Sequence, residues 1–241
     1  MRRTFLLLAA LVVAPAIARA QGGVNFYWND CGMGVPAAAQ YFACTTNTGP
    51  AYSAFGTVIV PIEVPHFVGL TGSISLCAMG GMAPAWWALQ PGGCRENALS
   101  VSFDPASNSS QCFDDVWGGQ LPVQAVTAEF TPPAASSFRL RMSAALPAGS
   151  ETALAADGSE FYMFRLVVRR DASTGDGSCA GCLQPVVLFL DACRLQQADG
   201  SFVTISGPAA SNWLSWNAGD PTTCYVPSSN RTWGAIKSLY R

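Results

Sequence analysis

Two neighbouring stretches decide the fold class: TVIVPIEV, Thr57–Val64, and VGLTGSISLC, Val68–Cys77. In both stretches apolar residues recur at every second position. In the second stretch the residues between them are mainly threonine and serine. A period of two is that of a β-strand with one face in the core and the other towards water. We therefore expect two strands here.

The same alternation continues through most of the chain. It predicts strands at Leu99–Phe103, Val123–Phe130, Phe138–Leu146, Tyr162–Val168, Phe202–Ile205 and Trp213–Trp216. Val186–Leu190 is continuously apolar, which is typical of a central strand covered on both faces. Pro61 and Pro65 lack the amide that a sheet ladder needs, so their segment is expected at a sheet edge. Strands that are wet on one side predict an all-β antiparallel β-sandwich with long loops.

Helix is scarce in this sequence. Pro36–Phe42 has room for one or two helical turns. Near the end, Thr232 can cap a short C-terminal helix that places Trp233, Ile236 and Tyr240 on one face. The chain contains no clear linker and no repeat, so we expect residues 21–241 to form a single β-sandwich domain.

The first 20 residues have the form of a secretory signal peptide. A basic start, Met1-Arg2-Arg3, precedes the apolar run Thr4–Ile17 and the small-residue cleavage site Ala18-Arg19-Ala20. The alternative is a membrane anchor, but a spanning helix needs roughly 20 apolar residues. We expect export to the periplasm, the cell surface or the medium, with no membrane span in the mature chain.

Composition limits the possible functions. The chain has 13 Lys+Arg, 15 Asp+Glu and a net charge of −2, and loss of the three leader arginines makes it −5. An acidic chain with one lysine has no basic stripe for nucleic acid. The single histidine, His66, excludes any site that needs two. No zinc-protease motif, phosphate loop or dinucleotide fingerprint is present.

Nine cysteines indicate a disulfide framework in an oxidising compartment. Nine is odd, so at least one thiol has no partner within the chain. Their order suggests two groups, 31–112 and 179–224. We expect most bridges within the groups and the spare thiol in the first. The nine are Cys31, Cys44, Cys77, Cys94, Cys112, Cys179, Cys182, Cys193 and Cys224.

Cys179-Ala180-Gly181-Cys182 has the spacing of a redox or zinc motif. A redox pair needs a strand before it and a helix after it, whereas this one follows a Gly/Ser/Asp loop and precedes an apolar strand. A four-cysteine zinc site needs a second close pair, and only Cys193 and Cys224 are near in sequence. A structural loop with one or two disulfides fits best.

Catalytic groups are not singled out by any motif. His66 lies between two strand stretches without a Gly-x-Ser-x-Gly elbow to supply a nucleophile. Paired carboxylates could hydrolyse glycosides; the candidates are Glu63, Glu96, Glu129, Glu151 and Glu160. We assign no catalytic residue.

Calcium is the one cofactor for which the sequence offers ligands. Asp171 and Asp176 share one loop, and Asp104 and Asn108 share another. Calcium takes six to eight oxygens, and neither loop has the EF-hand order. We read both loops first as solvated turns and expect no other metal or cofactor.

Seven tryptophans are many for this length. Trp86, Trp87 and Trp117 stand beside Gly/Pro loops. Exposed rings there could stack on the faces of sugars. The alternative is that the rings pack the loop bases onto the sheet.

The sequence carries two resemblances to known groups of proteins. The first rests on Trp28-Asn29-Asp30-Cys31, Phe67-Val68-Gly69, Trp86-Trp87, Cys94-Arg95, Ala98-Leu99-Ser100, Cys112, Asp115-Val116-Trp117-Gly118-Gly119, Cys179-Ala180-Gly181-Cys182 and Thr232-Trp233-Gly234-Ala235-Ile236-Lys237. The combination resembles uncharacterised cysteine-containing exported proteins of environmental bacteria. This implies export and one cysteine-rich domain, and it transfers no site. Separately, Gly56–Val64 followed by Gly69 looks like the opening of cohesin-type or carbohydrate-binding sandwiches, a likeness of fold alone.

The sequence thus favours an exported, non-enzymatic structural or binding module whose partner is unknown. A glycan or a surface protein is the expected kind of partner. The alternative is a secreted carbohydrate-binding module or polysaccharide hydrolase.

Overall fold

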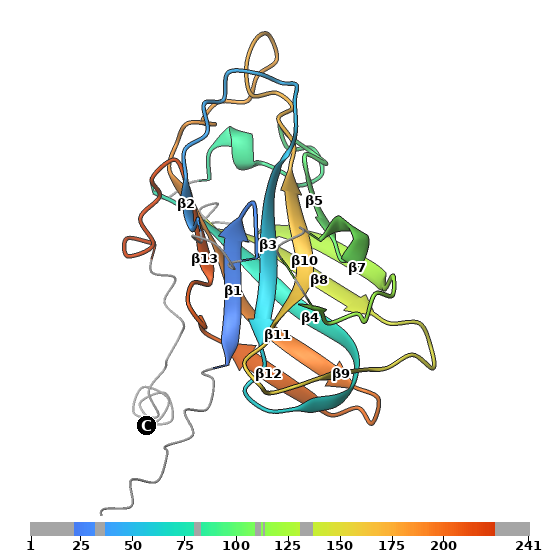
Figure 1. Cartoon of the computed structure of the whole chain (residues 1–241). Helices are drawn as coiled ribbons and strands as arrows, with labels where there is room; N and C mark the ends of the chain where they lie inside the picture. The colour runs from blue at the N-terminus through green and yellow to red at the C-terminus, as the bar shows by residue number, and fades with distance from the viewer. Residues whose placement is uncertain are drawn as a thin grey trace, which may run out of the picture.

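The computed structural model describes residues 22–31, 37–79, 83–108, 112, 114–130 and 137–224. Its strands form two sheets that pack face to face, with the smaller sheet in front of the larger one in Figure 1. Nearly all pairs among the described strands are antiparallel; the exceptions are β2 with β13 and β6 with β10. The expected all-β antiparallel sandwich is confirmed.

The smaller sheet has five strands. Its order is β1 (Gly23–Trp28), β3 (Tyr52–Ile59), β10 (Glu160–Val168) and β5 (Leu99–Ser102). The short β6 (Asp114–Asp115) pairs with β10. β5 follows the 3-10 turn η1 (Ala85–Trp87) and precedes η2 (Pro105–Ser107).

The larger sheet has eight strands. Its order is β2 (Ala39–Gln40), β13 (Trp213–Trp216), β11 (Val186–Gln197), β4 (Val64–Ala78), β8 (Ser137–Ala145) and β7 (Val123–Phe130). β12 (Phe202–Ser206) pairs with β11, and β9 (Thr152–Leu154) pairs with β4. β11 lies inside this sheet, as the continuous apolar run at its start predicts.

The inner faces of the two sheets form one hydrophobic core. Alternate residues of β4, such as Leu70, Ile74 and Leu76, belong to the same buried cluster as Phe26 of β1 and Phe164 of β10. The alternation that predicts the strands is therefore the alternation that fills the space between the sheets.

Two expectations for the segment around Pro61 and Pro65 are wrong: where its strand ends, and that it lies at the edge of a sheet. The strand expected at Thr57–Val64 ends at Ile59; the chain bends at Pro61 and resumes in β4 at Val64. β4 is an inner strand and not an edge strand, because it lies between β11 and β8. Its ladder with β11 extends only to Phe67, so Pro65 lies beyond that ladder.

The alternation of apolar and polar residues does not predict β1. All six residues of Gly23–Trp28 are buried, so neither face of the strand is exposed to water. The helical turn expected at Pro36–Phe42 is wrong, because Ala39–Gln40 forms β2. The expected C-terminal helix from Thr232 and the signal peptide, residues 1–20, lie outside the described residues.

Four disulfides link the described cysteines, and three of them contradict the expected grouping. Cys31–Cys112 lies within the first group. Cys44–Cys182, Cys77–Cys224 and Cys94–Cys179 each join the first group to the second. The spare thiol is the buried Cys193, in the second group and not the first.

The reason for this pairing is the way the loops gather. Figure 1 shows the β2–β3 and β10–β11 loops together at one end of the sandwich. The side-chain amide of Asn47 donates to Thr174 O at 2.8 Å, and its oxygen accepts from Ser173 N at 2.7 Å. The sheets thus bring cysteines that are far apart in sequence close together, which order along the chain does not reveal.

Candidate functional site

The three tryptophans considered for ligand stacking are all fully buried. Trp86, Trp87 and Trp117 are each 0% exposed. The rings of Trp86 and Trp87 pack on Trp216, with centroids 4.8 and 5.3 Å away. The Trp117 indole N–H donates to Met163 O at 2.8 Å. Stacking on a sugar would require these rings to leave the core, so their burial supports loop anchoring rather than ligand stacking.

The Trp86 loop is held by a buried arginine. Arg95 is 2% exposed, and its guanidinium carbon lies 3.5 Å from the centroid of the Trp86 ring. It donates to Trp86 O at 3.1 Å, to Asp171 O at 2.7 Å and to Arg169 O. Burial lowers the pKa of Arg95 to about 10. The three carbonyls satisfy a cation that has lost water, so this cluster is a structural one.

Cys179 and Cys182 belong to two different bridges, to Cys94 and Cys44. The structural interpretation of this motif is confirmed. Neither sulfur is free for redox exchange or zinc. In the described ranges, no group of three or more His, Cys, Asp or Glu side chains is arranged to hold a metal ion.

The candidate acids have separate surroundings. Exposed His66 lies with its Nδ1 2.8 Å from Oε2 of Glu151. Glu160 accepts from the Asn25 amide at 2.7 Å and from the Thr57 hydroxyl. Glu96 accepts from Gly92 N at 2.9 Å. Glu63 is exposed, and the side chain of Glu129 is outside the described ones. In these contacts no two of the described candidate carboxylates share a partner.

The loop acids proposed for calcium also have protein partners. Asp104 Oδ1 accepts from Ala106 N at 2.8 Å and caps η2. Asp171 Oδ2 lies 2.9 Å from Arg169 Nε. Asp176 is exposed on the β10–β11 loop. Such contacts are typical of capped and solvated turns.

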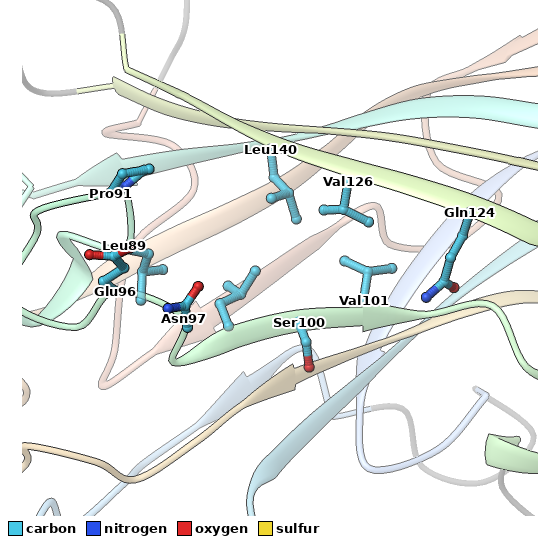
Figure 2. A pocket seen from close by; sticks show the side chains of 10 residues that line it. Leu89, Pro91, Glu96, Asn97, Ser100, Val101, Gln124, Val126 and Leu140 are labelled. Carbon is cyan, nitrogen blue, oxygen red and sulfur yellow. The ribbon is translucent and has the colours of Figure 1, made fainter.

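A groove between the two sheets is the most promising binding site. It encloses about 400 Å³ between β5 of the smaller sheet and β7 and β8 of the larger sheet. Figure 2 shows Val126 and Leu140 pointing across it towards Val101. Leu89 and Leu99 complete the apolar lining. A concave site that combines apolar side chains with a few polar groups is the usual form of a binding pocket.

The two ends of the groove are polar. At one end Gln124 reaches from β7 to the other sheet, where its Oε1 accepts from Phe103 N at 3.2 Å. At the other end lie Glu96 and Asn97, in the segment just before β5 (Figure 2). Gln124 therefore makes a hydrogen bond across the mouth of the groove to the residue that follows β5.

Both strands that flank the groove are edge strands. Within the described residues, β5 forms a ladder only with β10, and β7 forms one only with β8. Each strand therefore presents backbone N–H and C=O groups that have no strand partner among the described residues. Such an edge is a template for pairing with another extended chain.

β7 has few of the features that usually protect an edge. Its eight residues pair with β8 in continuous register, without a bulge. The strand contains no proline or lysine and one charged residue, Glu129. Apolar side chains are exposed on it and just before it: Leu121 at 66%, Val123 at 73% and Val126 at 38%. A long, regular, weakly charged edge of this kind favours strand addition.

Two other hollows lie away from the β5 and β7 edges. One, of about 440 Å³, lies beside the Cys31–Cys112 bridge and is lined by Asp114, Asp157 and Glu160. Hydrogen bonds from Ser159 lower the pKa of Asp157. The other, of about 460 Å³, surrounds the Cys179–Cys182 loop. Neither is lined by a β5 or β7 residue, so the groove remains the candidate site.

Sequence reasoning did not identify this groove. The strand expected at Val123–Phe130 has the observed bounds, and its weak charge is visible in the sequence. That it lies at the end of the larger sheet, opposite β5, follows from pairing between distant segments. The alternation of side chains shows which residues face inwards, but it does not say which strand lies last in a sheet.

Comparisons with known proteins give a likeness at the level of fold. No family model matches the sequence, and no curated protein matches it. The second type II cohesin module from the cellulosomal adaptor scaffoldin of Acetivibrio cellulolyticus has 10% identity and a TM-score of 0.38; the match covers 83% of this chain and 98% of that one. The cohesin module from a Clostridium perfringens family 33 glycoside hydrolase has 12% identity and a TM-score of 0.35, over 81% and 96% of the two chains. Scores this low carry no argument about partners.

Proposed function

We propose that this protein is an exported, non-catalytic binding module that holds an extended segment of another polypeptide along the β7 edge. The observation that carries the proposal is the regular β7 edge strand beside a groove that is partly lined by apolar side chains. Main-chain hydrogen bonds would add the segment to the sheet, and the groove would take its side chains.

Export is supported by two features. The first 20 residues have the form of a secretory leader, and eight of the nine cysteines form disulfides. Disulfides persist in oxidising compartments outside the cytosol. In the described part of the chain, no helix is both long enough and apolar enough to cross a membrane.

The proposal is tested by panning a phage-displayed library of random eight-residue peptides, the length of β7, on the oxidised protein. We expect enriched peptides whose binding is lost in Val126→Asp, because a carboxylate would then enter the apolar groove. The matched control is Val123→Asp, the same change on the same strand, at a residue that does not line the groove. Enriched peptides that bind Val126→Asp as well as the unchanged protein would contradict the proposal, as would a library that yields none.

A further inference from the structure

The side chains that line the groove restrict which segment can fit. A strand added to β7 directs every second side chain into the space between the sheets. The walls of that space combine apolar and polar residues. The apolar ones are Leu89, Pro91, Leu99, Val101, Val126 and Leu140, and the polar ones are Glu96, Asn97, Ser100 and Gln124. A polar side chain placed against the apolar part of these walls would lose water without gaining a partner, so the inward positions beside it favour apolar residues.

The size of the groove favours large side chains. A closed cavity of about 150 Å³ holds one benzene ring. The groove encloses about 400 Å³, which is room for roughly two such groups. Two neighbouring inward positions of one strand, each with a leucine or phenylalanine, would fill it better than alanine or valine.

A second copy of this chain is a poorer occupant than a foreign segment. The β7 side chains at the groove are Gln124 and Val126, and Figure 2 shows both beside it. A copy added through its own β7 would bring the same two side chains. Gln124 already accepts a hydrogen bond within its own chain, from Phe103 N. The copy would therefore bring a polar glutamine as one of these two side chains.

The charge at one end of the groove favours a basic residue in the bound segment. Among the described residues that line the groove, Glu96 alone is charged, and it is exposed. The chain as a whole has a net charge of −2. A basic residue in the bound segment would lie favourably beside Glu96, and an acidic one would be repelled.

We infer that the segment bound at β7 is a strand of a different protein, with large apolar residues at alternate positions and a basic residue at the Glu96 end. This inference rests on the proposed function. It adds the chemistry of the partner to the edge at which that partner would bind.

The test uses three synthetic peptides of eight residues, matched in length to β7. In the first, leucine and phenylalanine alternate with threonine, and lysine stands at one end. The second has the same composition with the apolar residues adjacent, so that they no longer share a face. The third is the first with glutamate in place of lysine. Each carries a fluorescent label, and anisotropy measures its binding to the full-length oxidised protein.

We expect the adjacent-residue peptide to bind about tenfold more weakly than the alternating one, because half of its apolar side chains would face water. The glutamate peptide should bind about threefold more weakly than the lysine peptide, as for an exposed charge pair. Glu96→Gln should remove that threefold difference and leave the tenfold one. Light scattering of the free protein should show a monomer.

The possible failures are distinct. Equal binding of the alternating and adjacent peptides, still lost in Val126→Asp, would overturn the inferred pattern and leave the proposed function standing. No binding by any peptide, or binding unchanged in Val126→Asp, would overturn both. A dimer that Val126→Asp disrupts would overturn the inference of a foreign segment. It would show that a second copy of this chain binds at the β7 edge. Val126→Ala, which introduces no charge, should weaken binding less than Val126→Asp, and thermal melts confirm that each variant is folded.

Discussion

At the scale of single residues, Gly56 shows how closely this core is packed. It lies on β3, where it pairs with Phe164 of β10. A Cβ atom built on Gly56 would lie 2.3 Å from the Cζ atom of the Phe164 ring. The Phe164 ring occupies the space that a side chain at position 56 would need. Glycine is therefore required here because there is no room for a Cβ atom, and not because the backbone turns.

Gly56→Ala should lower the free energy of unfolding by about 1–3 kcal/mol, because the Phe164 ring must leave its position. Urea unfolding of the two proteins measures the change. The control is Gly72→Ala on β4, where the new Cβ would meet the flexible end of Met142 at 3.0 Å. Gly72→Ala should destabilise less, and an equal loss at both sites would contradict the packing argument.

The buried Cys193 gives a prediction about pH. Burial, with a smaller contribution from Asp191, raises the pKa of its thiol from 9.0 to about 12. A folded pKa above the unfolded value means that the thiol stabilises the fold fully below pH 9 and loses that contribution as pH rises towards 12. Burial also raises the pKa values of Tyr27 and Tyr162 from 10.0 to about 12. These tyrosines therefore also lose a stabilising contribution as pH rises above 10.

The free energy of unfolding should therefore begin to fall near pH 9. Cys193→Ala should remove most of the fall between pH 9 and 10, where the two tyrosines contribute less because their unfolded pKa is 10.0. Arg95 acts in the opposite direction above pH 10, since its folded pKa is lowered to about 10, so the comparison stops there. Urea midpoints at pH 8, 9 and 10 test this. A slope that is the same with and without the thiol would argue against it.

At the scale of elements, the loops at one end of the sandwich are held by covalent and polar contacts together. Cys94–Cys179 and Cys44–Cys182 connect them. Arg95 adds hydrogen bonds to the carbonyls of three separate residues, and Trp86 N donates to Ala180 O at 2.9 Å. The tryptophans of η1 are thus buried by loops that come from distant parts of the chain.

Arg95→Lys should destabilise the protein by about 1.5–3 kcal/mol, because one ammonium cannot reproduce the planar set of bonds to three carbonyls. Loss of ring contact should also reduce the near-UV circular dichroism of Trp86. Arg170→Lys is the control: Arg170 is partly exposed and bonds one carbonyl, that of Pro50 at 2.7 Å. A similar loss for both variants would show that burial of Arg95 adds nothing.

At the scale of the whole molecule, the disulfides join the two halves of the sequence. Three of the bridges span 85, 138 and 147 residues. Bridges that close long loops remove much of the freedom of the unfolded chain, typically about 2–4 kcal/mol each. The stability of this sandwich therefore depends on oxidation as well as on its core.

Cysteine chemistry checks this arrangement directly. In the folded, unreduced protein no cysteine should react with iodoacetamide, because eight are bridged and Cys193 is 0% exposed. In denaturant without reductant, Cys193 alone should react. Peptide mapping should then recover Cys31–Cys112, Cys44–Cys182, Cys77–Cys224 and Cys94–Cys179. A bridge to Cys193, or rapid labelling before denaturation, would overturn the pairing.

The kind of fold and most of its strands could be predicted from the sequence. Val123–Phe130 and Trp213–Trp216 have the expected bounds. This succeeded because the direction of a strand side chain depends on its position along the strand, with a period of two. The signal fails for β1, which is buried along its whole length, and at Val60–Glu63, where apolar alternation continues through a bend.

Three features emerge only in the folded molecule: the disulfide partners, the position of β7 at the end of a sheet, and the burial of Trp86, Trp87 and Trp117. Each of these depends on contacts between segments far apart in the chain. The alternation in a strand specifies which face is buried but carries no information about the neighbouring strand or loop. The candidate groove is such a property, since it exists only where β5 and β7 lie opposite each other.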